Sequence, residues 1–131
     1  MSKEDYDRGM TVRRKVLGDA HIKKRAAGGD RYTTEQYRLV TEFAWGMVWS
    51  RPNLPLKTRS LITIAMLTAL DKPDELSGHV RAAITNGNTP DEIMEVFVQA
   101  SVYCGIPAAN NAMRVALEVL KKMGLLPETP R

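Results

Sequence analysis

The sequence predicts an all-α protein of about six helices in a single domain spanning residues 1–131. Helix capping and stop signals recur along the whole chain, and the apolar residues repeat with helical spacing. No segment shows the alternating pattern of a half-buried strand. A chain of 131 residues is long enough for one hydrophobic core and too short for two large ones.

The first two helices are predicted from the residues at their ends. Ser2 caps a helix that Gly18 ends, since glycine tolerates the backbone conformation that follows a helix. Thr33 and Gln36 form a capping box for a second helix, which continues to about Trp49. The segment between these helices is expected to be a loop.

Four further helices are expected over residues 56–70, 73–86, 90–104 and 107–123. Apolar residues lie on nearly every side of the first of these, which is therefore expected to be central and buried on most faces. Residues 89–92 form a second capping box, and two lysines followed by a glycine close the last helix.

The net charge of +4 raises the question of nucleic-acid binding. Residues 1–31 hold nine Lys or Arg and five Asp or Glu, whereas the remainder of the chain holds ten of each. The basic cluster at residues 13–15 and 23–25 is interleaved with acids and has few aromatic neighbours. We interpret it as a solvated face rather than a nucleic-acid interface.

Other classes of protein are not favoured by the composition. The longest apolar stretch, residues 61–70, is much shorter than the ~20 residues that cross a bilayer, and no export signal is expected, so we predict a cytoplasmic protein. Cys104 is the only cysteine and is expected to be a buried apolar residue rather than a nucleophile. With two histidines and one thiol, we expect neither a zinc cluster nor a cysteine redox pair.

Two residues on the expected fourth helix have the form of an acid/base pair. Glu75 and His79 are four residues apart, so they share a helix face, and the carboxylate is placed to orient the imidazole or to hold its proton. The same spacing is also that of an ordinary surface salt pair, and spacing alone does not decide between them. His21, the other histidine, is expected to lie exposed in a loop.

Aromatic and cationic residues gather at the end of the second helix. Trp45 and Trp49 precede Arg51, so two indole rings and a guanidinium meet at one corner. The rings suit either core packing or the apolar wall of a carboxylate site. Arg59 begins a helix that is expected to be buried, and so requires an anionic partner, either an acid such as Glu42 or a ligand.

Together these residues resemble those of the γ-carboxymuconolactone decarboxylases, a family of the protocatechuate branch of aromatic catabolism. The matching stretches are residues 12–21, 43–52, 58–66, 74–79 and 103–107. The related peroxidases carry two cysteines before the matching histidine, whereas this chain has Lys72 and Glu75 there, which excludes disulfide-based peroxide reduction.

The resemblance implies an alkylhydroperoxidase D-like helical bundle that assembles as a homohexamer and uses no cofactor. It also implies a carbon-carbon lyase that decarboxylates a small dianionic lactone to β-ketoadipate enol-lactone. His79 and Glu75 would be catalytic, with His21 as another possible proton donor. The expected substrate-binding residues are Arg51, Arg59, Trp45, Trp49 and His21. Alternatives are a paralogue that acts on another lactone or keto acid and a non-enzymatic oligomeric binding protein.

Overall fold

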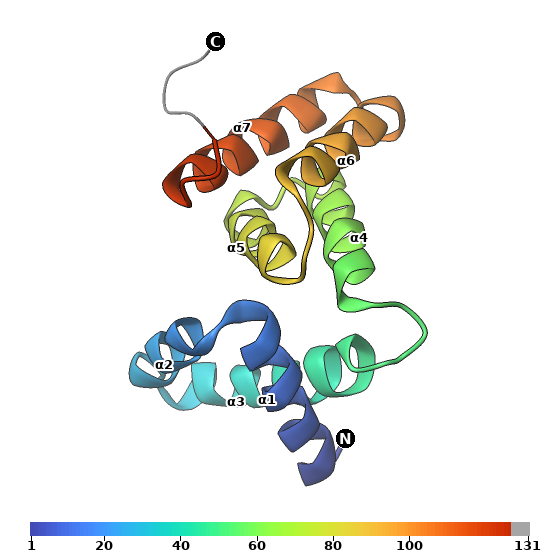
Figure 1. The fold of residues 1–131 in the computed structure, drawn as a ribbon. Coiled ribbons are helices and arrows are strands. Elements are labelled where there is room, and N and C mark those ends of the chain that lie inside the picture. Colours follow the sequence, from blue (N-terminus) through green and yellow to red (C-terminus); the bar gives the residue numbers. More distant parts are fainter. Residues whose placement is uncertain (127–131) are drawn as a thin grey trace. The chain divides into compact units, whose positions relative to one another are not determined.

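The computed structural model describes residues 1–126 and is helical throughout (Figure 1). It contains seven α-helices and one π-helix, and no strand occurs in this range. The prediction of an all-α fold is confirmed, with one more α-helix than expected. The last five residues of the expected domain, 127–131, lie outside the described part. The chain divides into two compact units, Met1–Leu56 and Lys57–Arg131, which are treated separately below.

Unit 1 begins with α1 (Lys3–Leu17) and α2 (Asp19–Ala27). Ser2 caps α1 as predicted, because its hydroxyl accepts a hydrogen bond from the backbone N–H of Asp5. Gly18 ends α1 with a φ of 91° and is followed at once by α2. The expected loop is therefore a second helix, and His21 is exposed on α2 rather than in a loop.

The next helix, α3 (Arg31–Val40), starts three residues earlier than predicted. Its cap is Asp30, whose carboxylate accepts from the N–H of Thr33, while the Thr33 hydroxyl accepts from the N–H of Asp30. Thr33 is thus the third residue of a reciprocal capping box and not the cap. The prediction failed because aspartate is at least as good a cap as threonine, and here it comes first in the chain.

A π-helix, η1 (Thr41–Trp49), continues directly from α3 where the sequence predicted more α-helix. α1 crosses η1 with backbone against backbone at Gly9 and Gly46. A Cβ atom on Gly9 would lie 2.9 Å from the Gly46 nitrogen, and one on Gly46 would lie 2.8 Å from the Asp5 carbonyl carbon. Only glycine permits an approach this close.

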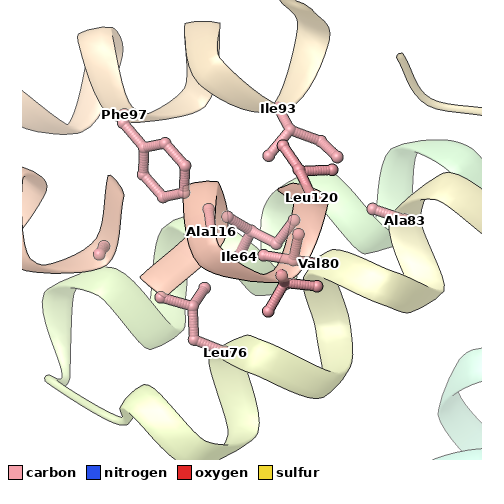
Figure 2. Packing of buried hydrophobic residues seen from close by; sticks show 10 residues of the cluster. Ile64, Leu76, Val80, Ala83, Ile93, Phe97, Ala116 and Leu120 are labelled. Atoms are coloured by element: carbon pink, nitrogen blue, oxygen red, sulfur yellow. The ribbon is translucent and has the colours of Figure 1, made fainter. Parts of the chain in front are cut away.

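Unit 2 contains α4 (Leu56–Ala69), α5 (Pro73–Thr85), α6 (Pro90–Tyr103) and α7 (Ile106–Lys122). Figure 2 shows that side chains from all four helices meet in one core. Phe97 and Ile93 come from α6 and pack with Leu120 of α7, and each is completely buried. Truncating a buried aromatic such as Phe97 to alanine typically costs about 3–5 kcal/mol. The predicted capping box at the start of α6 is present.

The prediction that α4 is buried on most faces is wrong within this chain. Its buried residues, Ser60, Ile64 and Thr68, form a single stripe. Ile62 and Met66 are exposed, with 38% and 59% of their surface accessible. Such an exposed apolar face is unusual for a helix that another surface does not cover. No helix in residues 1–126 combines the length and apolar character needed to cross a membrane.

The crossing of α1 and η1 yields a stability prediction. Gly46→Ala places a methyl group against the backbone of Asp5, so the free energy of unfolding should fall by about 1–3 kcal/mol or more. Gly78→Ala on α5 is the control, because no atom lies within 4 Å of its added Cβ. That variant should gain about 0.5–1 kcal/mol from the higher helix propensity of alanine. Denaturant unfolding followed by circular dichroism measures both, and equal stability of the two variants would contradict the close crossing.

Candidate functional site

The two tryptophans stack at the end of η1 in unit 1. The ring centroids of Trp45 and Trp49 lie 4.9 Å apart with an interplanar angle of 30°. Trp45 is buried and Trp49 is partly exposed, so the pair forms part of the core and also presents an aromatic surface. The predicted core packing is therefore seen for Trp45, and stacked aromatic pairs of this kind are favourable.

The exposed guanidinium of Arg51 follows this corner directly. Its backbone N–H donates to the Val48 carbonyl at 3.1 Å, which fixes the chain as it leaves η1. One turn earlier, the carbonyl of Gly46 accepts from Nε of Arg8 at 2.8 Å and from the Ser50 hydroxyl. These bonds hold the end of η1 to α1 and so fix the backbone from which Arg51 extends.

Glu42, which the sequence offered as a partner for Arg59, lies buried in unit 1. Its carboxylate pairs with Arg38 at 2.8 Å. A buried carboxylate needs such a partner, because an isolated charge is costly in a low-dielectric environment. The internal acid is thus already in an ion pair within its own helical segment.

Glu75 and His79 lie on α5 in unit 2, one turn apart. His79 is largely buried, and this burial lowers the pKa of its imidazole below the ordinary value of 6.5, whereas the nearby Glu75 carboxylate raises it. The pKa of His79 is therefore lowered overall. The stability that neutral His79 contributes is therefore present above pH 6.5 and is lost as pH falls through the pKa of the folded protein.

Arg59 is partly buried in the first turns of α4. Two asparagines beyond the end of α5 hold this part of α4 in place. Nδ2 of Asn86 donates to the Ser60 hydroxyl at 2.9 Å, and Nδ2 of Asn88 donates to the Lys57 carbonyl at 3.0 Å. The backbone of Arg59 is therefore fixed on both sides relative to the helix that carries His79.

The asparagines were missed in the sequence analysis, although Asn-Gly-Asn at a helix end is a recognisable turn signal.

The predicted site residues are divided between the two units. Trp45, Trp49, Arg51 and His21 belong to unit 1, and Arg59, Glu75 and His79 belong to unit 2. The structure brings Trp45 against Trp49, and the charge of Glu75 acts on His79.

His21 differs from His79 in its surroundings. It is exposed on α2, and partial desolvation together with the charges of Arg13, Arg25 and Lys24 lowers the pKa of its imidazole. No carboxylate counteracts these cations as Glu75 does at His79. The charges around the two imidazoles therefore act in opposite directions, because the cations disfavour the protonated form of His21 whereas the Glu75 carboxylate favours that of His79.

Arg13 corrects the interpretation of the N-terminal basic cluster as a solvated face. Its side chain is buried, with 7% of its surface accessible. The guanidinium donates to the Thr41 hydroxyl at 2.8 Å and stacks over the Tyr37 ring at 4.1 Å. The sequence signal was present, because Arg13 shares one face of α1 with the buried residues Gly9 and Val16.

Neither a metal cluster nor a disulfide is seen among the described residues. Across residues 1–126, no three side chains of His, Cys, Asp or Glu are grouped as metal ligands. Cys104, at the end of α6, is a free thiol that is partly exposed.

Comparison with known proteins gives a consistent result. The model of the carboxymuconolactone decarboxylase family matches residues 34–118. 4-Carboxymuconolactone decarboxylase from Acinetobacter baylyi is 46% identical over 123 residues, which cover 94% of this chain and 92% of the relative. Nitrosuccinic acid decarboxylase npaB from Metarhizium robertsii is 39% identical over 118 residues, covering 90% and 82%. An uncharacterized 15.0 kDa protein from Paracoccus denitrificans is 38% identical over 83 residues, or 61% of each chain.

The electrostatics of α5 give a direct test. Glu75→Gln should lower the pKa of His79 further, because it removes the negative charge that favours the imidazolium. The pKa of His21 should not change, since Glu75 does not contribute to it. NMR titration of the two histidines in the wild type and in Glu75→Gln measures both values. An unchanged His79 pKa would show that the two side chains do not interact.

Proposed function

The chain belongs to the carboxymuconolactone decarboxylase family, and we propose that it decarboxylates γ-carboxymuconolactone to β-ketoadipate enol-lactone and carbon dioxide. The observation that carries the proposal is the 46% identity to 4-carboxymuconolactone decarboxylase across nearly the whole chain. The reaction belongs to protocatechuate catabolism, and the protein is a carboxy-lyase.

The substrate itself supplies the electron sink for this reaction. When the bond between the ring carbon and its carboxylate breaks, the electron pair forms a new ring double bond. The existing double bond shifts, and negative charge develops on the lactone carbonyl oxygen. A proton then adds to the ring carbon next to that carbonyl. No step requires an external electron acceptor, so the proposed enzyme uses no cofactor.

The protein must hold two carboxylates, stabilise the dienolate oxygen and deliver one proton. We assign the carboxylates to Arg51 and Arg59, because a guanidinium fork matches a carboxylate in geometry and charge. Trp45 and Trp49 supply an apolar wall beside Arg51. This wall excludes water and so strengthens the ion pair between the guanidinium and a substrate carboxylate. His21 remains a candidate for binding the substrate.

We assign the proton transfer to His79 with Glu75 as its partner. The lowered pKa of His79 makes its imidazolium a stronger acid than an exposed histidine. Glu75 favours the protonated form, and a bound dianion acts in the same direction, so protonation of His79 would accompany substrate binding. Carbon dioxide leaves as a neutral molecule, so its negative charge remains on the dienolate until the proton from His79 adds to the ring carbon.

The alternatives are less well supported. Nitrosuccinic acid decarboxylase, the relative that acts on a different small dicarboxylic acid, is less similar and matches less of this chain. A non-enzymatic binding protein is not favoured, because both relatives with a named activity are decarboxylases. The lactone therefore remains the preferred substrate.

We further propose that the protein forms a homo-oligomer, which we expect to be a hexamer, and that it works in the cytoplasm. Exposed apolar side chains on unit 2 support association, because a monomer rarely leaves such residues in contact with water. They include Ile62, Met66, Leu70, Val98 and Val102. A single free thiol, Cys104, suits a reducing compartment.

Kinetics of variants test the assigned roles. His79→Gln should keep the helical fold and lower kcat by about 10²- to 10⁴-fold, the usual scale of a positioned proton transfer. Arg51→Ala or Arg59→Ala should chiefly raise KM if the arginine binds the carboxylate that the product retains. Turnover of the lactone is followed with a chelator present, because the proposed mechanism needs no metal.

Arg81→Ala is the matched control, since this arginine is exposed on α5 and has no assigned role. It should behave as the wild type. Full turnover by folded His79→Gln would remove His79 from the mechanism and direct attention to His21. Complete loss of wild-type activity in chelator, restored by a metal, would contradict the cofactor-free reaction.

The oligomer is tested by sedimentation at micromolar protein concentration. The wild type should sediment as a hexamer. Met66→Glu places a charge on the exposed apolar face of α4 and should shift the distribution toward smaller species. Lys121→Glu changes charge outside this face and serves as the control. A folded wild-type monomer at these concentrations would contradict the proposal.

A further inference from the structure

Unit 1 contains a buried positive charge without a carboxylate partner among the described residues. Arg13 forms no ion pair there, and its Nε atom is buried without a hydrogen-bond acceptor. Within the part of the chain that the structure describes, the guanidinium donates a hydrogen bond to the hydroxyl of Thr41, which carries no charge. Because buried arginines are normally paired with an anion, the site is electrostatically incomplete.

A second cation, Arg25, acts on Arg13 and adds to this imbalance. Arg25 and Lys24, on α2, are close enough to act on His21, and Arg25 also acts on Arg13. The carboxylates of unit 1 that form ion pairs or capping hydrogen bonds form them with residues other than Arg13. Asp30 caps α3, Asp19 pairs with Arg14, Asp7 with Lys3, Asp5 with Arg8, and Glu35 and Glu42 with Arg38.

A cavity of about 230 Å³ opens beside this cluster. It is lined by Tyr6, Arg25, Gly29, Thr33, Thr34 and Tyr37. Tyr37 connects the cavity with the buried charge, because the Arg13 guanidinium stacks on its ring. Thr34 adds an exposed hydroxyl to the cavity lining.

The lining indicates the class of ligand. Arg25 supplies a charged fork for an anion, and the two tyrosine rings supply apolar walls. Inorganic phosphate has no apolar part to pack on such walls. The cavity is also smaller than the roughly 300 Å³ at which drug-sized ligands are typically bound. A small acid with a short hydrocarbon body fits both features.

We propose that this cavity binds a small organic carboxylate, which Arg25 contacts directly and whose charge the buried Arg13 stabilises through the Tyr37 wall. The site lies entirely within unit 1 and uses none of the residues assigned to catalysis. The proposal therefore does not depend on the decarboxylase activity. Either a substrate-like acid or a separate metabolite supplies the same chemistry, and competition with the lactone distinguishes the two.

Isothermal titration of the full chain with succinate tests the site. The wild type should bind succinate, and Arg25→Gln should weaken binding roughly 10- to 100-fold, as expected when a charge-assisted hydrogen bond is lost. Arg31→Gln makes the same charge change on an exposed arginine that stacks on Tyr32 outside the cavity, and should bind normally. Equal weakening in both variants would indicate a general charge effect and contradict the proposal.

Two glycine variants test the cavity itself without changing any charge. A Cβ on Gly29 would lie 3.3 Å from the Thr34 hydroxyl oxygen and would narrow the cavity, whereas one on Gly28 would have its nearest contact at 3.8 Å. Gly29→Ala should therefore weaken succinate binding, and Gly28→Ala should not. The absence of binding by folded wild type, equal binding by the two glycine variants, or binding of phosphate alone would overturn the proposal.

Discussion

The backbone contact between α1 and η1 at Gly9 and Gly46 positions most of unit 1. Because the two helices approach without side chains between them, the residues on either side of the contact are held at short range. Arg8 reaches the Gly46 carbonyl, and Arg13 reaches the Thr41 hydroxyl. The same contact therefore supports the corner of η1 and buries a guanidinium farther along α1.

In unit 2, hydrogen bonds take the place of the glycine contact and hold the start of α4. Asn86 and Asn88 bind the first turn of α4 through its Ser60 hydroxyl and Lys57 carbonyl. Hydrogen bonds from a side-chain amide are directional, so they fix the helix start more precisely than apolar packing alone. The remainder of the unit is an apolar core, which holds α5 and the imidazole of His79 in a partly dehydrated environment.

The fold was largely predictable because its signals are local. Ser2, Gly18 and the capping box at Thr89 mark helix ends through short-range hydrogen bonds that any helix requires. The features that were missed depend on partners distant in sequence. The π-helix lies where α1 crosses closely, and the burial of Arg13 involves Tyr37 of α3 and Thr41 of η1. No local pattern contains that information.

The candidate site shows the same division. Spacing alone placed Glu75 and His79 on one helix face, and the structure adds the direction of the His79 pKa. The sequence also placed Trp45 and Trp49 together, since residues four apart meet on one side of a helix. The role of each side chain depends on charge and water around a bound substrate, which helix spacing does not determine.

Turnover of γ-carboxymuconolactone by the wild type in D₂O tests the central claim most directly. NMR of the products should show one equivalent of carbon dioxide and an enol-lactone with a single deuterium on the ring carbon next to the carbonyl. That position follows from electron flow into the lactone carbonyl and protonation of the resulting dienolate. A folded protein that leaves the lactone unchanged, or a product deuterated only at another carbon, would contradict the account.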